Sequence, residues 1–194
     1  MTKPEPKAKP EPKAKTPSKA KPESGDGDMR KISIGKVVVN IGVGKSGEAV
    51  ERARKVLQQI TAQKPASRKA RKSIRDFGTH QGEPIGLVVT GRGQEKCKEL
   101  IGRLLIAREK KMNSSSFDSR GSVSFGLKEH IEIPGIRYDP EIGIWGMNVS
   151  VLLERPGYRV SRRRRRSASL GKAHVITKDE AMEYFKREFE VTIE

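Results

Sequence analysis

The chain has 194 residues, of which 34% are hydrophobic and 34% charged, and its 41 lysines and arginines face only 24 acidic residues. The resulting net charge of +17 predicts a polyanionic partner, and the usual candidates are nucleic acid and an anionic membrane. A membrane is the weaker candidate, because no apolar run approaches the roughly 20 residues of a spanning helix. The N-terminus also lacks an apolar signal segment.

Cysteine and histidine usage limits the chemistry. The single cysteine, Cys97, excludes an internal disulfide and a cysteine-rich zinc site. His80, His130 and His174 lie too far apart in sequence to match metal-ligand spacing. We therefore predict no metal, no cofactor and a reducing, cytoplasmic setting.

The first 28 residues are predicted to be a low-complexity tail, and residues 29–194 a single folded domain. Lys3–Ala8 and Lys9–Ala14 both read KPEPKA, and this proline alternation favours extended chain. The tail is interpreted either as a disordered solubilising segment or as a basic arm that orders along RNA. Its seven lysines and five acidic residues leave a net charge of only +2, so the domain carries +15 and should make the main contact.

Residues 31–41, KISIGKVVVNI, are β-branched and predict the first strand. The turn that follows, GVGKSG at residues 42–47, matches a dinucleotide-binding pattern and the end of a Walker A loop. Val39 stands where a Walker A loop needs glycine, and no acidic residue suits the second strand about 20 residues later. The segment is interpreted as a tight strand-to-helix turn, or as a turn whose N–H groups and Lys45 hold an RNA phosphate, with a nucleotide site as a further alternative.

A helix is predicted over residues 48–60, with Val50, Ala53, Leu57 and Ile60 on one apolar stripe. Five cations without a compensating acid follow it between residues 64 and 72. A run of this kind is usually a solvated linker, but an uncompensated patch also suits RNA phosphate.

The segment GTHQGEP, at residues 78–84, contains no side chain that could fill a core. It is interpreted either as an ordinary hairpin connection or as a mobile flap that contacts a partner. Gly78 and Gly82 give the backbone its freedom, and Pro84 marks the return into a strand.

Further strands are predicted over residues 84–91, 122–133 and 146–154, and a helix over residues 94–107. The buried face of that helix is predicted to hold Cys97, Leu100, Ile101, Leu104 and Leu105. The last helix begins with a T-x-x-E capping box, Thr177 and Glu180, and its buried side is predicted to be Met182, Phe185 and Phe189. We predict an α+β fold, a curved antiparallel or mixed sheet with helices packed on one face.

Catalytic residues are not evident, since no nucleophile is paired with a base. Glu129 and His130 are adjacent in a predicted strand, so their side chains should face opposite ways, a solvated glutamate beside a packed histidine.

Five consecutive arginines, residues 162–166, repel one another unless a polyanion screens them. The guanidinium group of arginine forms bidentate hydrogen bonds with phosphate and stacks on bases, which suits structured RNA. Aromatic residues are only 5%, so contact through shape and phosphate is favoured over base stacking.

Three stretches resemble one family. They read VVVNIGVGKSGEA, then QKPASRKARKSIRDFGTHQGEPIGLVVTGRG, then FDSRGSVSFGLKEHIEIPGIRYDPEIGIWGMNVSVLLERPGYRV. In this order and spacing they closely resemble the ribosomal protein L5 family, whose members carry 5S ribosomal RNA. The resemblance runs from Met29 to the C-terminus. The motifs EHI, PGI, RPGYRV and ITKDEAMEYF are similar to the archaeal or eukaryote-like form.

The resemblance implies a non-enzymatic constituent of the large ribosomal subunit in the cytoplasm. Such proteins hold 5S RNA in the central protuberance, against the large-subunit ribosomal RNA. They also contact a small-subunit protein across the subunit interface and the P-site transfer RNA. Two alternatives are a nucleotide-dependent enzyme that uses residues 42–46, and a free RNA chaperone with no fixed assembly.

The residues assigned to these contacts come from the basic runs, the turns and the resemblance together. Contacts to 5S RNA are predicted for Asn40, Gly42, Lys45, Gln63, Lys64, Arg68, Lys69, Arg71, Lys72 and Thr90. Contacts to the large ribosomal RNA are predicted for Arg162, Arg163, Arg164, Arg165 and Arg166, and transfer RNA contacts for Gly78, Thr79, His80, Gln81 and Gly82. Asn40, Gln63 and Thr90 lie at the ends of predicted strands and a helix, and are expected to form one compact hydrogen-bonding set.

Overall fold

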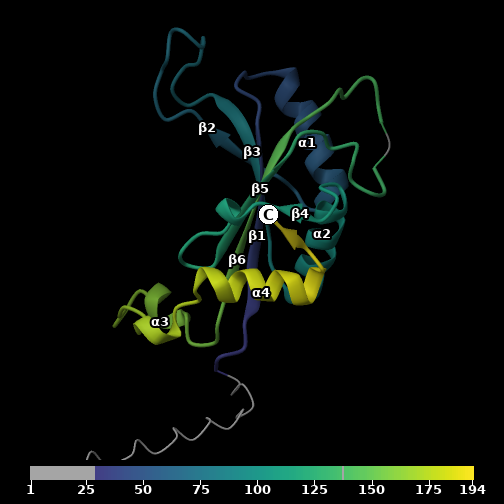
Figure 1. The fold of residues 1–194 in the computed structure, drawn as a ribbon. Coiled ribbons are helices and arrows are strands. Elements are labelled where there is room, and N and C mark those ends of the chain that lie inside the picture. The colour runs from purple at the N-terminus through teal and green to yellow at the C-terminus, as the bar shows by residue number, and fades with distance from the viewer. Residues whose placement is uncertain (1–28, 137) are drawn as a thin grey trace, which may run out of the picture.

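Residues 29–136 and 138–194 are described by the computed structural model, and they form a five-stranded antiparallel sheet with helices on one face (Figure 1). The predictions for the tail, residues 1–28, lie outside these described residues. In chain order the elements are β1 Ser33–Gly42, α1 Glu48–Thr61, β2 Ala66–Lys69, β3 Pro84–Gly91, α2 Gln94–Ile106, β4 Lys111–Met112, the short 3₁₀ helix η1 Ser114–Ser116, β5 Ser122–Leu127, β6 Met147–Glu154, α3 Arg159–Arg162, the 3₁₀ helix η2 Lys172–His174, α4 Lys178–Phe189 and β7 Thr192–Ile193. The predicted α+β class is confirmed.

The order of the main sheet is β2-β3-β1-β6-β5, which places β1 at its centre. Because side chains alternate between the two faces of a strand, the buried Val37, Val39 and Ile41 of β1 all point to one face. Their cross-strand neighbours continue this apolar layer, for example Val39, which lies opposite both Val89 of β3 and Val149 of β6. The last strand, β7, pairs in parallel with β4 in a separate two-stranded sheet.

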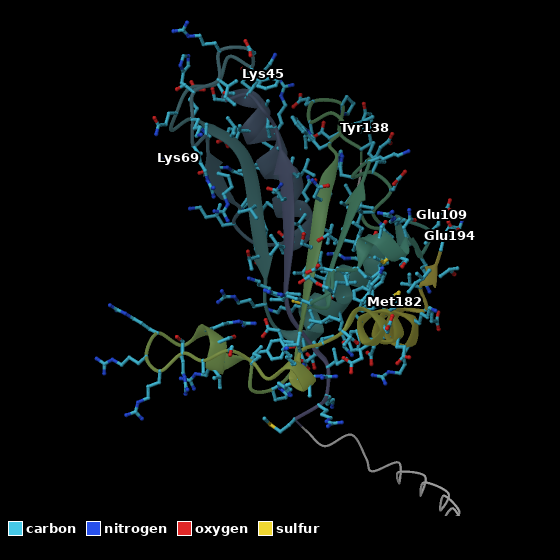
Figure 2. All side chains as sticks on the ribbon, turned by 60° about the vertical axis from the view of Figure 1, so that its left-hand side comes forward. Lys45, Lys69, Glu109, Tyr138, Met182 and Glu194 are labelled. Carbon is cyan, nitrogen blue, oxygen red and sulfur yellow. The ribbon has the colours of Figure 1, made fainter. Side chains whose placement is uncertain are left out.

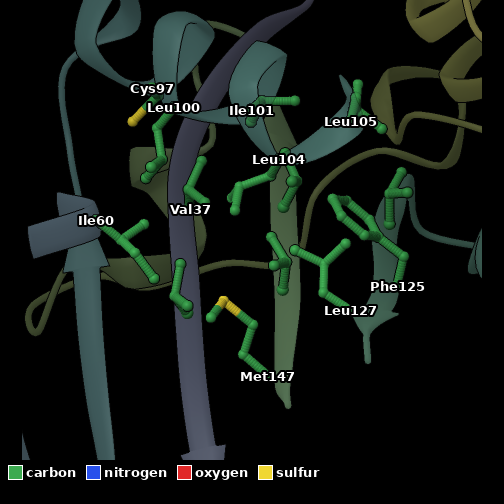
Figure 3. Close-up of a cluster of buried hydrophobic side chains, with 14 of the residues drawn as sticks. Val37, Ile60, Cys97, Leu100, Ile101, Leu104, Leu105, Phe125, Leu127 and Met147 are labelled. Carbon is green, nitrogen blue, oxygen red and sulfur yellow. The ribbon is translucent and has the colours of Figure 1, made fainter. Parts of the chain in front are cut away.

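Helices α1, α2 and α4 cover this apolar face. The predicted stripe of α1 is confirmed, since Val50, Ala53, Leu57 and Ile60 are all buried. The five residues predicted for the buried face of α2 are buried as well, and Figure 3 shows them over Val37, Met147 and the side chains of β5. An ion pair between Lys98 of α2 and Glu188 of α4 joins the two helices at the surface.

The start of α4 follows the predicted capping box. Thr177 Oγ1 accepts the backbone N–H of Glu180 at 3.4 Å, and the Glu180 carboxylate accepts the backbone N–H of Thr177 at 3.0 Å. The buried side differs from the prediction: Phe185 is fully buried, but its companions are Ala181 and Tyr184, whereas Met182 and Phe189 are only partly covered. The buried face of α4 is therefore centred on Ala181, Tyr184 and Phe185.

The strand predicted over residues 122–133 is too long. The strand β5 ends at Leu127, and the described residues 128–136 and 138–146 form no strand. Within that loop Ile133 N donates to the carbonyl of His130, and the ring nitrogen Nδ1 of His130 accepts the backbone N–H of Trp145 at 3.3 Å. The expected pairing of a solvated Glu129 with a packed His130 is found, but a turn produces it rather than strand alternation.

The loop that contains His130 should become less stable in mild acid, because protonation would place a positive charge on a side chain that is only 2% exposed. Burial lowers the pKa of His130, although the nearby Glu129 partly opposes this shift. In the unfolded chain the imidazole of His130 therefore takes up a proton at about pH 6.5, whereas in the folded chain the same protonation needs a lower pH. The free energy of unfolding should fall as the pH drops below about 6.5, by at most about 1.4 kcal/mol per pH unit from this site.

Urea unfolding at pH 7.5 and 5.5 measures this effect. The variant His130→Gln removes the titrating group and keeps a side chain that can accept the Trp145 N–H, so its unfolding free energy should change less between the two pH values. Equal pH dependence in the two proteins would contradict the assignment to His130.

Candidate RNA-binding surface

The face of the sheet that points away from the helices is polar, and we call it the open face. It consists of the side chains on the other face of each strand, principally Lys36, Val38, Asn40, Val88, Thr90, Ser122, Ser124, Asn148, Ser150 and Leu152, of which Val88 is itself buried. Asn40 lies directly opposite Asn148, and Val38 lies opposite both Thr90 and Ser150. Lys36 and the apolar Val38, Val88 and Leu152 aside, these positions carry short amide or hydroxyl side chains, so this surface offers many hydrogen-bonding groups without charge.

Small residues keep the open face flat. Ser124 Oγ donates to Ser150 Oγ across β5 and β6 at 3.1 Å. A Cβ atom added to Gly126 would lie 3.3 Å from the side-chain oxygen of Asn148, closer than most such contacts. A surface of this kind admits the close approach of a large rigid partner. No helix of the described residues is long and apolar enough to cross a membrane.

One edge of the open face is strongly basic. Within the basic run of residues 64–72, which was interpreted either as a solvated linker or as an RNA-binding patch, Ala66–Lys69 form the strand β2, paired antiparallel with β3. All four residues of β2 are exposed, as are Lys64, Arg71 and Lys72 on either side. Ala66 lies opposite Val88 and Arg68 opposite Gly86, so Arg68 belongs to the open-face side of the edge strand. The cations of β2 and of the residues on either side of it therefore form a basic border along one edge of the sheet. This border lies beside the uncharged hydrogen-bonding groups of the open face.

The flap of the sequence analysis is the far part of a long hairpin that continues β2 and β3. Gly82 N donates to Ala70 O at 3.0 Å, and Gln81 N donates to Ser73 Oγ at 2.9 Å. Ile74 and Thr79 form an isolated antiparallel bridge, closed by the bond from Gly78 N to Arg75 O. The turn at the end of the hairpin is therefore residues 75–78. His80 and Gln81, which were predicted to contact transfer RNA, lie on the returning arm and not in this turn.

The glycine-rich turn between β1 and α1 packs beside that hairpin. Val43 N and Gly44 N both donate to Ile85 O, and Lys45 lines a hollow of about 390 Å³ together with Ile74 and Phe77. Gly44 and Gly47 have positive φ angles of 79° and 99°, which explains glycine at these two positions. The first turn of α1 carries Glu48 and Glu51, which disfavours a nucleotide phosphate at this helix N-terminus.

The arginine block does not act as one unit. Arg162 ends α3 and forms an ion pair with the carboxylate of Glu154, which is only 17% exposed. Arg163 Nε donates to Arg166 O at 2.7 Å, and the long side chains of this loop project away from the body (Figure 2). Residues 163–166 are all exposed. All five arginines are thus exposed, and Arg162 also fastens the loop to Glu154.

The base of the arginine loop is held by a small network. The hydroxyl of Tyr158 donates to His174 O and accepts the backbone N–H of Ile176 at 3.0 Å. His174 Nε2 lies 2.8 Å from Pro156 O. Residues 156–158 and 174–176 are thereby joined, so the loop leaves the body from a fixed position.

The three residues expected to form a compact set occupy two places. Asn40 and Thr90 share the open face on neighbouring strands, and each lies diagonally across from the other by two residues. Gln63 follows the end of α1 and lines a hollow of about 400 Å³ with Gly91 and Arg103, on the side of the helices. No hydrogen bond joins the three side chains among the residues that the structure describes.

Sequence reasoning missed the remaining polar residues of the open face. Asn148 and Ser150 alternate with Met147, Val149 and Val151 in β6. The alternation itself was visible, but nothing in one sequence says which strand lies beside which. Only the sheet order brings these residues next to Asn40.

The comparisons with known proteins identify the family of this chain. Residues 28–79 match the family model described as Ribosomal protein L5, and residues 84–184 match the model that describes the C-terminus of the same ribosomal family. The chain is 50% identical over 165 residues to the large ribosomal subunit protein uL5 of Nitrosopumilus maritimus, covering 85% of this chain and 95% of that protein. It is 51% identical over 166 residues to uL5 of Sulfurisphaera tokodaii, covering 85% and 93% respectively. The chain therefore belongs to the ribosomal protein L5 family.

Proposed function

We propose that this protein binds 5S ribosomal RNA on the open face and attaches it to the large-subunit ribosomal RNA in the central protuberance. The observation that carries the proposal is the open face itself, a flat polar sheet surface bordered by the basic strand β2. The relatives are named as proteins of the large ribosomal subunit, not as enzymes, which supports a structural role in the ribosome and in the cytoplasm.

The division of charge on this surface suits folded RNA. Cations around Arg68 and Lys69 attract the phosphate backbone, and that part of the affinity depends on salt. Amide and hydroxyl groups such as those of Asn40, Thr90 and Asn148 carry little long-range attraction, but they can bond to sugar hydroxyls and phosphate oxygens at fixed geometry. The open-face positions named above include no aromatic ring, so recognition by shape is favoured over base stacking.

The further contacts use the projecting parts of the molecule. Arg163, Arg164, Arg165 and Arg166 suit the large ribosomal RNA, because all four are exposed and the loop that carries them projects from the body (Figure 2). The end of the β2–β3 hairpin suits the P-site transfer RNA, since it extends beyond the sheet and carries Arg75 (Figure 1). Large subunits that lack residues 75–78 of this protein should retain 5S RNA and hold P-site transfer RNA less tightly in filter binding.

The loop of residues 128–146 suits a basic small-subunit protein across the subunit interface. It contains four acidic residues and two basic ones, in a chain whose overall charge is +17. Tyr138 and Ile144 are each 56% exposed and give it an apolar contact area. An acidic, partly apolar loop repels RNA and attracts a cationic protein surface.

Alanine substitutions on the open face test the proposal. Asn40→Ala and Thr90→Ala should each weaken 5S RNA binding by roughly 1 to 3 kcal/mol, because a partner group in the interface loses its bond. The slope of affinity against salt concentration should stay the same, since no charge is removed. Affinity is measured by titration at several salt concentrations.

Two further variants sharpen this experiment. Gln58→Ala removes an exposed amide from α1, in the helix layer, and should bind like the parent protein. Gln63→Ala can lose affinity only if the RNA reaches past the edge of the sheet. If Asn40→Ala and Thr90→Ala both bind 5S RNA as tightly as the parent protein, recognition through the open face is refuted. The cations of the basic border would then be the only remaining contact of this proposal.

A further inference from the structure

A basic hollow lies at the end of the molecule opposite the hairpin, where residues 30–32 run beside α4. Its volume is about 670 Å³, within the range of pockets that hold small ligands. Arg155, which follows β6, lies in its lining together with Glu180 and Tyr184 of α4 and with Ala173. We call it the Arg155 hollow. It shares no residue with the open face, so its occupant is separate from the RNA proposed there.

The guanidinium of Arg155 is the buried part of this site. The residue is only 7% exposed, its Nη2 donates to Glu180 Oε1 at 2.8 Å, and its Nη1 donates to His174 O at 3.4 Å. Its Nε–H is buried and finds no acceptor among the described residues. An unpaired buried donor on a charged group costs free energy, so an oxygen acceptor entering the hollow would be bound favourably.

The charges of the other lining residues indicate that this acceptor belongs to an anion. Five of the residues around the hollow are cationic, and only Glu180 and Glu183 are acidic. Since Glu180 is already paired with Arg155, Glu183 is the one acidic residue of the lining left to oppose Arg30, Lys31, Lys186 and Arg187. Outside the lining, Glu188 also attracts Lys31 and Arg187. All four cations are exposed and can move onto a ligand. The electrostatic balance selects an anion, and several cations around one buried guanidinium suit the oxygens of a phosphate.

We propose that the Arg155 hollow binds a phosphate group of an RNA strand, with Arg155 as its fixed donor and Lys186 and Arg187 as mobile counter-charges. An RNA strand is favoured because the hollow adjoins the base of the arginine loop. His174 accepts a hydrogen bond from Arg155 and, through Tyr158, anchors that loop. One phosphodiester chain can therefore contact the arginines of the loop and place a phosphate in the hollow.

The Nε–H signal of Arg155 in a ¹H–¹⁵N spectrum of the full-length protein reports directly on this site. Titration with single-stranded hexauridylate should shift that signal to saturation. The double variant Lys186→Gln with Arg187→Gln should raise the dissociation constant read from this signal by about tenfold or more, because two phosphate contacts are lost. The matched control, Lys55→Gln with Arg92→Gln, removes the same charge from exposed positions elsewhere and should change it by less than about twofold.

Other probes separate the possible sources of the anion. An Arg155 signal that does not respond to hexauridylate overturns the proposal, and so does an equal loss of affinity in the control variant. Inorganic phosphate binding as tightly as hexauridylate would assign the hollow to free phosphate, and hexaglutamate binding as tightly would assign it to an acidic peptide. Each of these two results overturns the assignment to RNA. This experiment uses no variant of the open face. Its result can therefore refute the Arg155 hollow without refuting 5S RNA binding on the open face, and the reverse also holds.

Discussion

Replacing Arg163, Arg164, Arg165 and Arg166 with serine is expected to weaken binding to large-subunit ribosomal RNA by orders of magnitude. Each cation that neutralises a phosphate adds about 0.7 to 0.9 to the slope of log affinity against log salt concentration. Loss of all four should therefore flatten this slope by up to about 3 units. The melting temperature should hardly change, because these side chains are exposed and exposed charges contribute little to stability.

Arg162 provides the contrast for this experiment. Its ion pair with the mostly buried Glu154 means that Arg162→Ser removes a stabilising partner as well as a charge. The melting temperature of this variant should fall more than that of the quadruple variant, while its salt slope should change less. Affinity is read from titrations at several salt concentrations and stability from thermal unfolding. An unchanged salt slope in the quadruple variant would show that the loop does not contact RNA phosphate.

Substitution of Phe185 by alanine is expected to give the largest loss of stability, about 3 to 5 kcal/mol. Phe185 is fully buried and packs edge-on against Phe117 at a centroid distance of 5.7 Å, so alanine leaves a cavity between α4 and the chain before β5. Phe189, whose ring lies 5.4 Å from that of Phe185, is only partly buried. Phe189→Ala should therefore cost clearly less.

Urea unfolding of the two variants measures this difference. In the absence of urea, under conditions where both variants remain folded, each should bind 5S RNA like the parent, because neither residue reaches the open face. Equal destabilisation by the two substitutions would mean that α4 is held by its surface contacts, such as the Lys98–Glu188 pair, and not by the ring of Phe185.

The elements with strong periodicity could be predicted from the sequence. The buried residues of α1 and α2 repeat at helical spacing, and the capping box marks the start of α4, because these signals depend only on neighbours within a few residues. The end of β5 could not be predicted, since residues 128–133 have strand-like composition and only the packing of His130 against the Trp145 backbone turns them into a loop.

The candidate site was predictable in its charges but not in its geometry. Basic residues on β2 and in the arginine loop were evident from composition. The pairing of Arg162 with Glu154 was not, because the two residues meet only after β6 has turned into α3. The open face depends on the order β2-β3-β1-β6-β5, which joins polar residues from distant parts of the chain, and no local pattern encodes that order.

The central position of β1 also determines the order in which this protein can fold. Ser33 Oγ donates to Glu154 O, a contact between residues 121 positions apart in the chain. While the protein is being synthesised, β1 can pair with β3 early, but its other edge, which carries three consecutive valines, stays unpaired until β6 has emerged. Sheet closure is therefore a late, non-local step, and such steps are slow and expose strand edges to aggregation. The second edge of β1 therefore has no strand partner until residue 154 is available.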